Sequence, residues 1–184
     1  MLTTTLAKIK NHDPCIYGWK KLLEGLDRGG YDHDDHDAPI PLERILEIND
    51  LDDALWALRT IEGHDNAIRL YACYCAKYSL YIFERKYSGD KHPKHAIETA
   101  GRFAHGDASR EELDAARDAA MDAVWGDAWD AVWDAAWAAA RDDAWDAARE
   151  AARAAAVLGD AWDDFRKEFV RLCRGEGEYG EVKE

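Results

Sequence analysis

The chain has 184 residues, the length of one ordinary domain and enough to build a hydrophobic core. Its 38 acidic and 24 basic side chains give a formal net charge of −14, which argues against direct binding of nucleic acid, because phosphate contacts need clusters of Lys and Arg. The first residues do not resemble a signal peptide, and no apolar run is long enough for a membrane span, so we expect a cytosolic protein that does not bind membranes.

The first segment, residues 2–26, is expected to hold short amphipathic N-terminal helices. Apolar residues recur at helical spacing from Leu2 to Ile9 and again from Ile16 to Leu26, and Asp13-Pro14 is the expected start of the second helix. An acidic loop follows over residues 27–41. We expect the four cysteines to be free thiols in the cytosol; they are Cys15, Cys73, Cys75 and Cys173.

The second segment, residues 42–105, carries the densest core signals and is predicted to form the core helices. One helix is predicted from Leu51 to Arg59 and another from Asp65 to Arg85, both packing against the C-terminal half. We expect the more buried positions to include Leu55, Trp56, Ile68 and Leu70. A buried tryptophan predicts that Trp56→Ala destabilises the protein by about 3–5 kcal/mol. Tyr71, Tyr74, Tyr78 and Tyr81 form a stripe on the second helix that is typical of packing.

A four-residue repeat of Trp, Ala and Asp dominates residues 109–172, and a polar tail follows over residues 174–184. Ser109 and Glu112 form a capping box that predicts the start of this helical region. The tryptophans are Trp125, Trp129, Trp133, Trp137 and Trp145. A helix turns ~100° per residue, so Trp145 falls ~160° from Trp129. One neighbour therefore cannot bury all five rings, and the region is either sandwiched between helices or broken, with Gly126 and Gly159 the expected weak points.

No stretch shows sustained strand alternation, so we predict an all-α fold, a single-domain helical bundle over residues 1–184 that includes the long Ala/Trp/Asp-repeat region. Residues 107–168 contain 17 acidic and 7 basic side chains, so −10 of the net charge lies there. Like charges four residues apart weaken a helix, so helix stability does not account for this acidity. We interpret it as a partner-binding acidic face for a protein with a basic surface, formed by Asp122, Asp130, Asp134, Asp142 and Asp146.

No catalytic motif appears, so we expect a non-enzymatic protein without a cofactor. Two alternatives remain open. His33 and His36, among aspartates of the acidic loop, could hold a divalent metal in a metal-dependent enzyme, although a solvated loop without metal is the simpler interpretation. The other alternative is a structural protein that self-associates as a homodimer through exposed tryptophans.

The blocks from Leu51 to Arg59, Glu62 to Asp65 and Ile68 to Ala76 resemble the phage- and prophage-encoded immunity-protein family, the immunity-protein-5-like group. The resemblance extends over most of the chain from Leu6 to about Cys173. It implies an all-helical protein that neutralises a toxin or a defence protein by binding it. Small acidic phage proteins also include anti-restriction and anti-CRISPR inhibitors, some of which mimic DNA, and these share the same stoichiometric block without chemistry.

Overall fold

The computed structural model describes residues 1–29, 35–84, 91–122, 134–135, 138–139, 143–156 and 161–179. Within these ranges the protein is helical apart from two short paired strands, which confirms the predicted all-α fold. The chain divides into two compact units, Met1–Glu62 (unit 1) and Gly63–Glu184 (unit 2). Their boundary falls inside the segment that was predicted to form one set of core helices, residues 42–105. The single-domain organisation stays a prediction, and each unit is described by itself.

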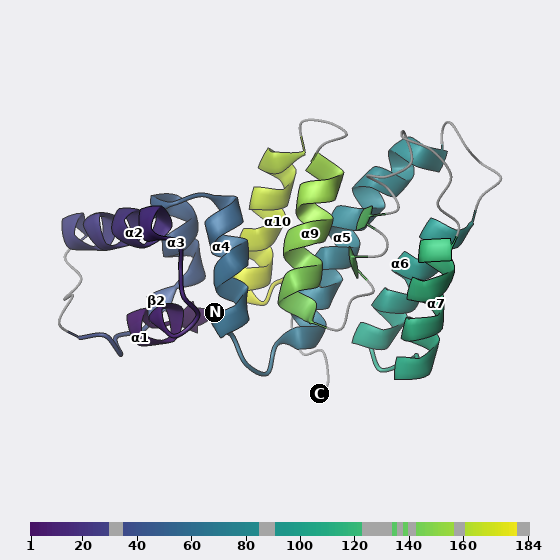
Figure 1. The fold of residues 1–184 in the computed structure, drawn as a ribbon, viewed down its shortest axis with the longest axis horizontal. Helices are drawn as coiled ribbons and strands as arrows, with labels where there is room; N and C mark the ends of the chain where they lie inside the picture. The colour runs from purple at the N-terminus through teal and green to yellow at the C-terminus, as the bar shows by residue number, and fades with distance from the viewer. Residues whose placement is uncertain are drawn as a thin grey trace. The chain divides into compact units, whose positions relative to one another are not determined.

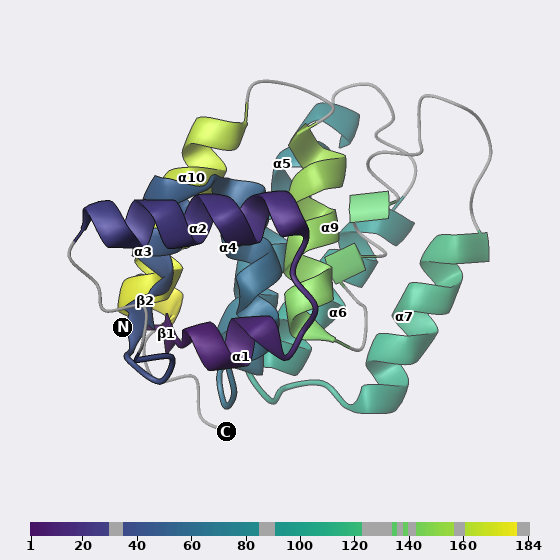
Figure 2. The ribbon, with the colours of Figure 1, turned by 60° about the vertical axis from the view of Figure 1, so that its left-hand side comes forward.

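Unit 1 consists of short helices joined by a small strand pair (Figures 1 and 2). Its elements are β1 (Thr3–Thr4), α1 (Leu6–Lys10), α2 (Ile16–Arg28), β2 (Ile40–Pro41), α3 (Leu42–Ile48), α4 (Leu51–Ala57) and the 3₁₀ turn η1 (Leu58–Thr60). The strands pair antiparallel, α2 packs on α3, and α3 packs on α4. At the contact between α2 and α3, any side chain at Gly25 would collide with Ile48, so glycine permits the close approach of these helices.

Side chains at the helix starts fix the boundaries in unit 1. The Thr5 hydroxyl accepts a hydrogen bond from the Lys8 amide at 3.1 Å, and the Asp50 carboxylate accepts one from the Asp53 amide at 2.9 Å. Both satisfy amides that have no partner within the helix. The predicted start of α2 at Asp13-Pro14 is corrected, because Cys15 occupies the capping position and its sulfur accepts from the Gly18 amide at 3.2 Å.

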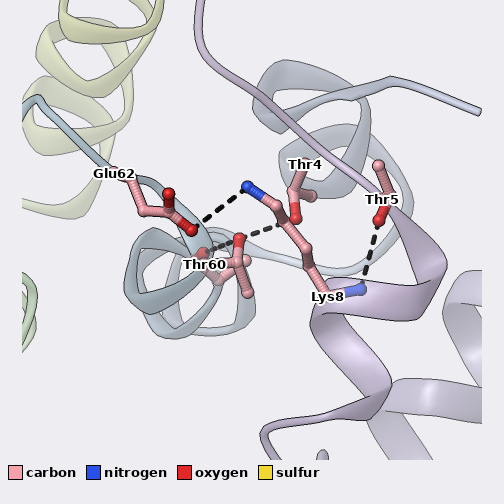
Figure 3. A network of polar contacts seen from close by, with 6 residues as sticks. Thr4, Thr5, Lys8, Thr60 and Glu62 are labelled. Carbon is pink, nitrogen blue, oxygen red and sulfur yellow. Dashed lines mark hydrogen bonds and ion pairs between the residues drawn. The ribbon is translucent and has the colours of Figure 1, made fainter. Parts of the chain in front are cut away.

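A buried polar link connects the two ends of unit 1 (Figure 3). The Thr60 hydroxyl lies 2.6 Å from the Thr4 hydroxyl and 2.7 Å from the Ala57 carbonyl oxygen. A hydroxyl has one proton, so Thr60 donates to the carbonyl and Thr4 donates to Thr60. The nearby ion pair between Lys8 and Glu62, at 3.4 Å, is exposed and adds little to stability. The buried hydroxyl pair therefore carries this connection.

The core of unit 1 includes Leu55 but not all of Trp56. Leu55 is fully buried, as predicted, whereas Trp56 is only half-buried. The Arg59 guanidinium covers the indole at 4.3 Å from its centroid, which leaves the ring between core and solvent. The expectation that Trp56 is among the more buried residues was therefore wrong. The face of α4 that packs in the core carries Leu55 and Ala54, and Trp56 lies beside that face.

We predict that Leu55→Ala destabilises the protein by about 2–5 kcal/mol, because it leaves a cavity in the core. Trp56→Ala is expected to cost less than Leu55→Ala, since much of the ring already contacts water or Arg59. Urea unfolding of both variants measures the two free energies. A larger loss for Trp56→Ala would show that the indole, and not Leu55, dominates this part of the core.

Unit 2 is arranged around one long helix. Its elements are α5 (Asp65–Glu84), α6 (His92–Ala104), α7 (Arg110–Asp122), α9 (Ala144–Ala156), α10 (Trp162–Arg174) and the 3₁₀ turn η2 (Gly177–Tyr179). Helix α5 contacts α6, α9, α10 and η2, whereas α7 packs on the far side of α6 (Figure 1). All residues from Ala67 to Cys73 are buried, which confirms the predicted burial of Ile68 and Leu70. Helix α5 is therefore covered on every side along this stretch.

Three of the four tyrosines in the α5 stripe pack against α10, so the predicted packing of the stripe holds for these three and not for Tyr81. Tyr71 is fully buried and donates a hydrogen bond to the Phe165 carbonyl oxygen at 3.1 Å. Tyr74 and Tyr78 meet the Phe165 ring edge-on, with centroids 6.3 and 5.6 Å away. Tyr81, at the end of the stripe, is 66% exposed and lies beyond this contact.

Helix α9 contacts α5 through a face made of alanine. The buried alanines are Ala144, Ala147, Ala148, Ala151, Ala152 and Ala155. Their spacing of three and four residues places them on one side of the helix. Trp145 and Asp146 are half-buried beside this face. Because alanine projects only a methyl group, α9 can lie close to α5 without long side chains between the backbones.

The predicted repeat region does not form a single helix. Helix α9 ends at Ala156 and α10 begins at Trp162, so the region is broken, one of the two arrangements that the tryptophan geometry required. The expected weak points, Gly126 and Gly159, lie outside the described residues. The same is true of Trp125, Trp129, Trp133 and Trp137.

Overfilling the alanine face should test the contact between α5 and α9. We predict that Ala148→Leu destabilises the protein by about 1–3 kcal/mol, because the added atoms have no space in a close helix contact. Ala154, on the same helix, is only half-buried, so Ala154→Leu serves as the matched control and should cost less. Chemical unfolding compares the two, and equal losses would contradict the assignment of this face.

Candidate protein-binding surface

The structure describes the side chains of two of the five predicted site aspartates, and these two lie in different surroundings. Asp134 is helical and exposed, whereas Asp146 is half-buried in the first turn of α9. Asp122 ends α7, but its side chain lies outside the described residues, as do Asp130 and Asp142 entirely. The proposal that these five residues form one continuous acidic face therefore stays a prediction.

Other exposed carboxylates of the repeat region, besides the five predicted site aspartates, were missed in the sequence. Glu111, Glu112 and Asp118 are exposed on α7. Asp163 and Asp164 are exposed in the first turn of α10. The sequence feature that could have identified most of them is a pair of neighbouring acidic residues just after a helix start. It was missed because the surface prediction followed the tryptophan repeat. These carboxylates extend the candidate protein-binding surface, defined here as the exposed acidic residues of α7 and α10 together with Asp134.

Part of the acidity is explained by the stability of helix starts. A single continuous helix would have fewer such starts. Helices α7, α9 and α10 each carry carboxylates in the first turn. The amino end of a helix bears partial positive charge, so these carboxylates stabilise their own helices. The conclusion that helix stability does not account for the acidity is therefore corrected. It does not hold for Glu111 and Glu112 at the predicted start of α7, nor for Asp146, Asp163 and Asp164 at the helix starts that the break in the repeat adds.

The predicted capping box opens α7. The Ser109 amide donates to the Glu112 carboxylate at 2.8 Å, and the Glu112 amide donates to the Ser109 hydroxyl at 3.2 Å. The hydrogen bond from the Ser109 amide is the main reason that the pKa of Glu112 is lowered. Arg102 of α6 lies 3.3 Å from the same carboxylate and lowers its pKa further. Glu112 is thus held as a charged, accepting group.

Basic residues near these carboxylates make local ion pairs. Arg117 lies 3.4 Å from Asp114 and 3.7 Å from Asp118 on α7. On α10, Lys167 lies 2.9 Å from Asp164, and this hydrogen bond raises the pKa of the Lys167 ammonium. These pairs are largely exposed, so each contributes little stability and can exchange for a partner's cation. The surface can accept hydrogen bonds and attract positive charge.

The thiols on α5 are suited to packing and not to nucleophilic chemistry. Burial raises the pKa of Cys73 to about 12, and it also raises the pKa of Cys75. The Cys73 thiol points toward α6 and donates to the Ile97 carbonyl oxygen at 3.7 Å. The four cysteines are free, as predicted, and Cys15 is the exposed one. A thiol that stays protonated at neutral pH is a poor nucleophile.

His36, the histidine of the acidic loop that the structure describes, does not belong to a group of metal-ligating side chains among the described residues. His36 is exposed, and its carbonyl oxygen accepts from the Ala7 amide at 2.9 Å. His33 lies outside the described residues. Among the residues that the structure does describe, no three His, Cys, Asp or Glu side chains are grouped as metal ligands. The metal-site hypothesis therefore has no support from the geometry of His36.

No helix in the described ranges has both the length and the apolar character that a membrane crossing requires. No protein-family model matches the chain, and no curated protein or solved structure matches it either. The resemblance to the immunity-protein family accordingly stays a prediction.

We predict that Glu112→Gln lowers stability at neutral pH, because the amide accepts the Ser109 hydrogen bond without a negative charge. The folded-state pKa of Glu112 lies below its ordinary value of 4.5, so its stabilising effect is present above that pH and is lost as pH falls through the folded-state value. The gap between wild type and Glu112→Gln should thus shrink on acidification. Urea unfolding at neutral pH and well below pH 4.5 measures this gap, with Glu24→Gln as an exposed control; a gap independent of pH would contradict the prediction.

Proposed function

We propose that the chain is a non-enzymatic, acidic binding protein that blocks a toxin or a bacterial defence protein by stoichiometric contact. The single observation that carries the proposal is the concentration of charge: residues 107–168 hold −10 of the formal −14, as 17 acidic and 7 basic side chains. The described helices of this region bury alanine and keep carboxylates of α7 and α10 at the surface. The candidate protein-binding surface is the part of the chain that we assign to the partner.

The expected partner is a protein with a basic surface, such as a toxin, a nuclease or another effector that binds nucleic acid. Long-range attraction between opposite charges speeds the encounter of two proteins, on the order of 10- to 1,000-fold in favourable cases. Local ion pairs such as Lys167 with Asp164 leave the region with a large net negative charge. A carboxylate-rich helical surface can thus compete for a site that otherwise holds phosphates, as a DNA mimic does.

The resemblance to the immunity-protein family supports an inhibitory function, and a phage origin would extend it to anti-restriction or anti-CRISPR activity. We place its action in the host cell cytosol, where free thiols such as Cys15 persist. The same proposal requires neither a cofactor nor catalysis by this chain. Self-association as a homodimer stays a separate prediction.

We predict that neutralising the acidic residues of unit 2 weakens partner capture. A variant with Asp122, Asp130, Asp134, Asp142 and Asp146 changed to Asn should slow association by about tenfold or more and reduce its dependence on salt. A second variant with Glu111, Asp118, Asp163 and Asp164 changed to the corresponding amides separates these carboxylates from the five predicted site aspartates. Affinity capture from host lysate with mass spectrometry identifies partners, and binding kinetics with the captured protein compare the variants.

The matched control removes five negative charges from unit 1, the number that the first variant removes from unit 2. Its five exposed positions are Glu24, Asp27, Asp35, Asp37 and Glu47, each changed to the corresponding amide. The control should bind nearly as wild type does, although its net charge changes equally. If the unit 2 variants bind undiminished, the acidic face does not determine binding; if the control is equally weakened, net charge alone is responsible.

A further inference from the structure

The C-terminal residues of the described chain, which were predicted to be part of a polar tail, fold back onto unit 2. Helix α10 ends with the Gly175 amide bound to the Leu172 carbonyl oxygen and the Glu176 amide bound to that of Arg171, both at 3.0 Å. Gly175 and Gly177 have φ angles of 68° and 64°, which favour glycine. We call residues 175–179 the C-terminal strap.

One side chain anchors the strap. Tyr179 is 5% exposed, and its hydroxyl donates to the Glu168 carboxylate at 2.8 Å. Glu168 is also buried, and Arg171 donates to its two oxygens at 3.1 and 3.0 Å. In contrast, all strap residues before Tyr179 are exposed. The strap therefore depends on the phenol ring and on a single charge-assisted hydrogen bond.

Two thiols lie in the core next to this anchor. Turn η2 contacts α5 and α10, which carry the fully buried Cys75 and Cys173. One helical turn from Cys75, the buried Tyr71 joins the two helices: its hydroxyl donates to the Phe165 carbonyl oxygen at 3.1 Å, and its ring meets Phe169 edge-on with centroids 5.9 Å apart. Cys73 faces α6 and its Ile97 carbonyl oxygen. The α5 cysteines are two residues apart and project in different directions.

We propose that the C-terminal strap is a releasable latch, in which withdrawal of Tyr179 opens the core between α5 and α10 and exposes Cys75 and Cys173. Gly175 and Gly177 lie in the segment that joins α10 to Tyr179, and glycine tolerates many backbone conformations, so the strap can change conformation at these two positions without rearranging α10. Glu176 and Glu178 are both exposed, and the ion pair of Glu176 with Arg174, at 3.9 Å, is exposed too and adds little to closure. Opening is thus a local event at the C-terminal end of unit 2.

The test measures thiol labelling by N-ethylmaleimide at each cysteine, resolved by mass spectrometry, in a Cys15→Ser background that removes the exposed thiol. Tyr179→Ala should speed labelling of Cys75 and Cys173 by about tenfold or more, because a buried aromatic anchor is lost. Labelling of Cys73 should not change. Tyr179→Phe keeps the ring but loses the hydrogen bond to Glu168, and should produce a smaller increase at the same two cysteines.

Two further variants make the outcome decisive. Gly177→Ala should open the latch with the tyrosine intact, because the φ angle of 64° disfavours alanine; the Arg171 guanidinium near an added Cβ is the end of a flexible side chain and can move aside. Tyr81→Ala makes the same chemical change at an exposed position and should leave all three rates unchanged. Unchanged labelling of Cys75 and Cys173 in Tyr179→Ala overturns the proposal. A parallel increase at Cys73 also overturns it, since general loosening of unit 2 would then be the cause.

Discussion

The burial of α5 on every side is the constraint on which the rest of unit 2 depends. A helix with no solvent-facing side along Ala67–Cys73 must find a complementary neighbour in each direction. Alanines of α9 supply the close contact, Phe165 and Phe169 of α10 receive the tyrosines, and α6 accepts the Cys73 thiol. Even the Arg69 charge is enclosed: it donates to the Ala139 carbonyl oxygen at 3.2 Å and lies 5.4 Å from the Phe103 ring. Such a charge is tolerated because polar and aromatic groups surround it.

The acidity of the chain acts at two levels. Carboxylates in the first turns of α7, α9 and α10 interact with the partial positive charge of the helix ends and with local cations. These interactions are short-ranged and satisfied within the protein. The region keeps a net negative charge that these interactions do not neutralise. This charge attracts or repels charged molecules over a longer distance. A protein of this composition can therefore be stable as an alanine-rich bundle and still present a strongly negative surface.

Local patterns in the sequence predicted much of the fold. The capping box of Ser109 and Glu112, the burial of Leu55 and the packing of Tyr71 each depend on spacing within one helix. The strand pair of unit 1 and the burial of Tyr179 were missed because they depend on contacts between distant segments. The break before α10 falls between Ala156 and Trp162, the interval of the sequence that contains Gly159, one of the two expected weak points. For the binding surface, sequence identified the acidic region, but the half-buried position of Asp146 needed the packing of α9.

The alanine face of α9 has a consequence for how the helix finds its alignment. Sliding α9 by four residues along α5 would replace Ala144 by Ala148 and Ala147 by Ala151, so the same methyl groups would meet α5 in either position. The alanine contact therefore does little to fix the register of α9 along α5. Alignment must come from the few larger side chains at its edges, such as Trp145 and Arg149, and from the Arg69 hydrogen bond to Ala139 just before the helix. Such an interface would accept the gain or loss of a four-residue unit during evolution more readily than a core of interlocking leucines.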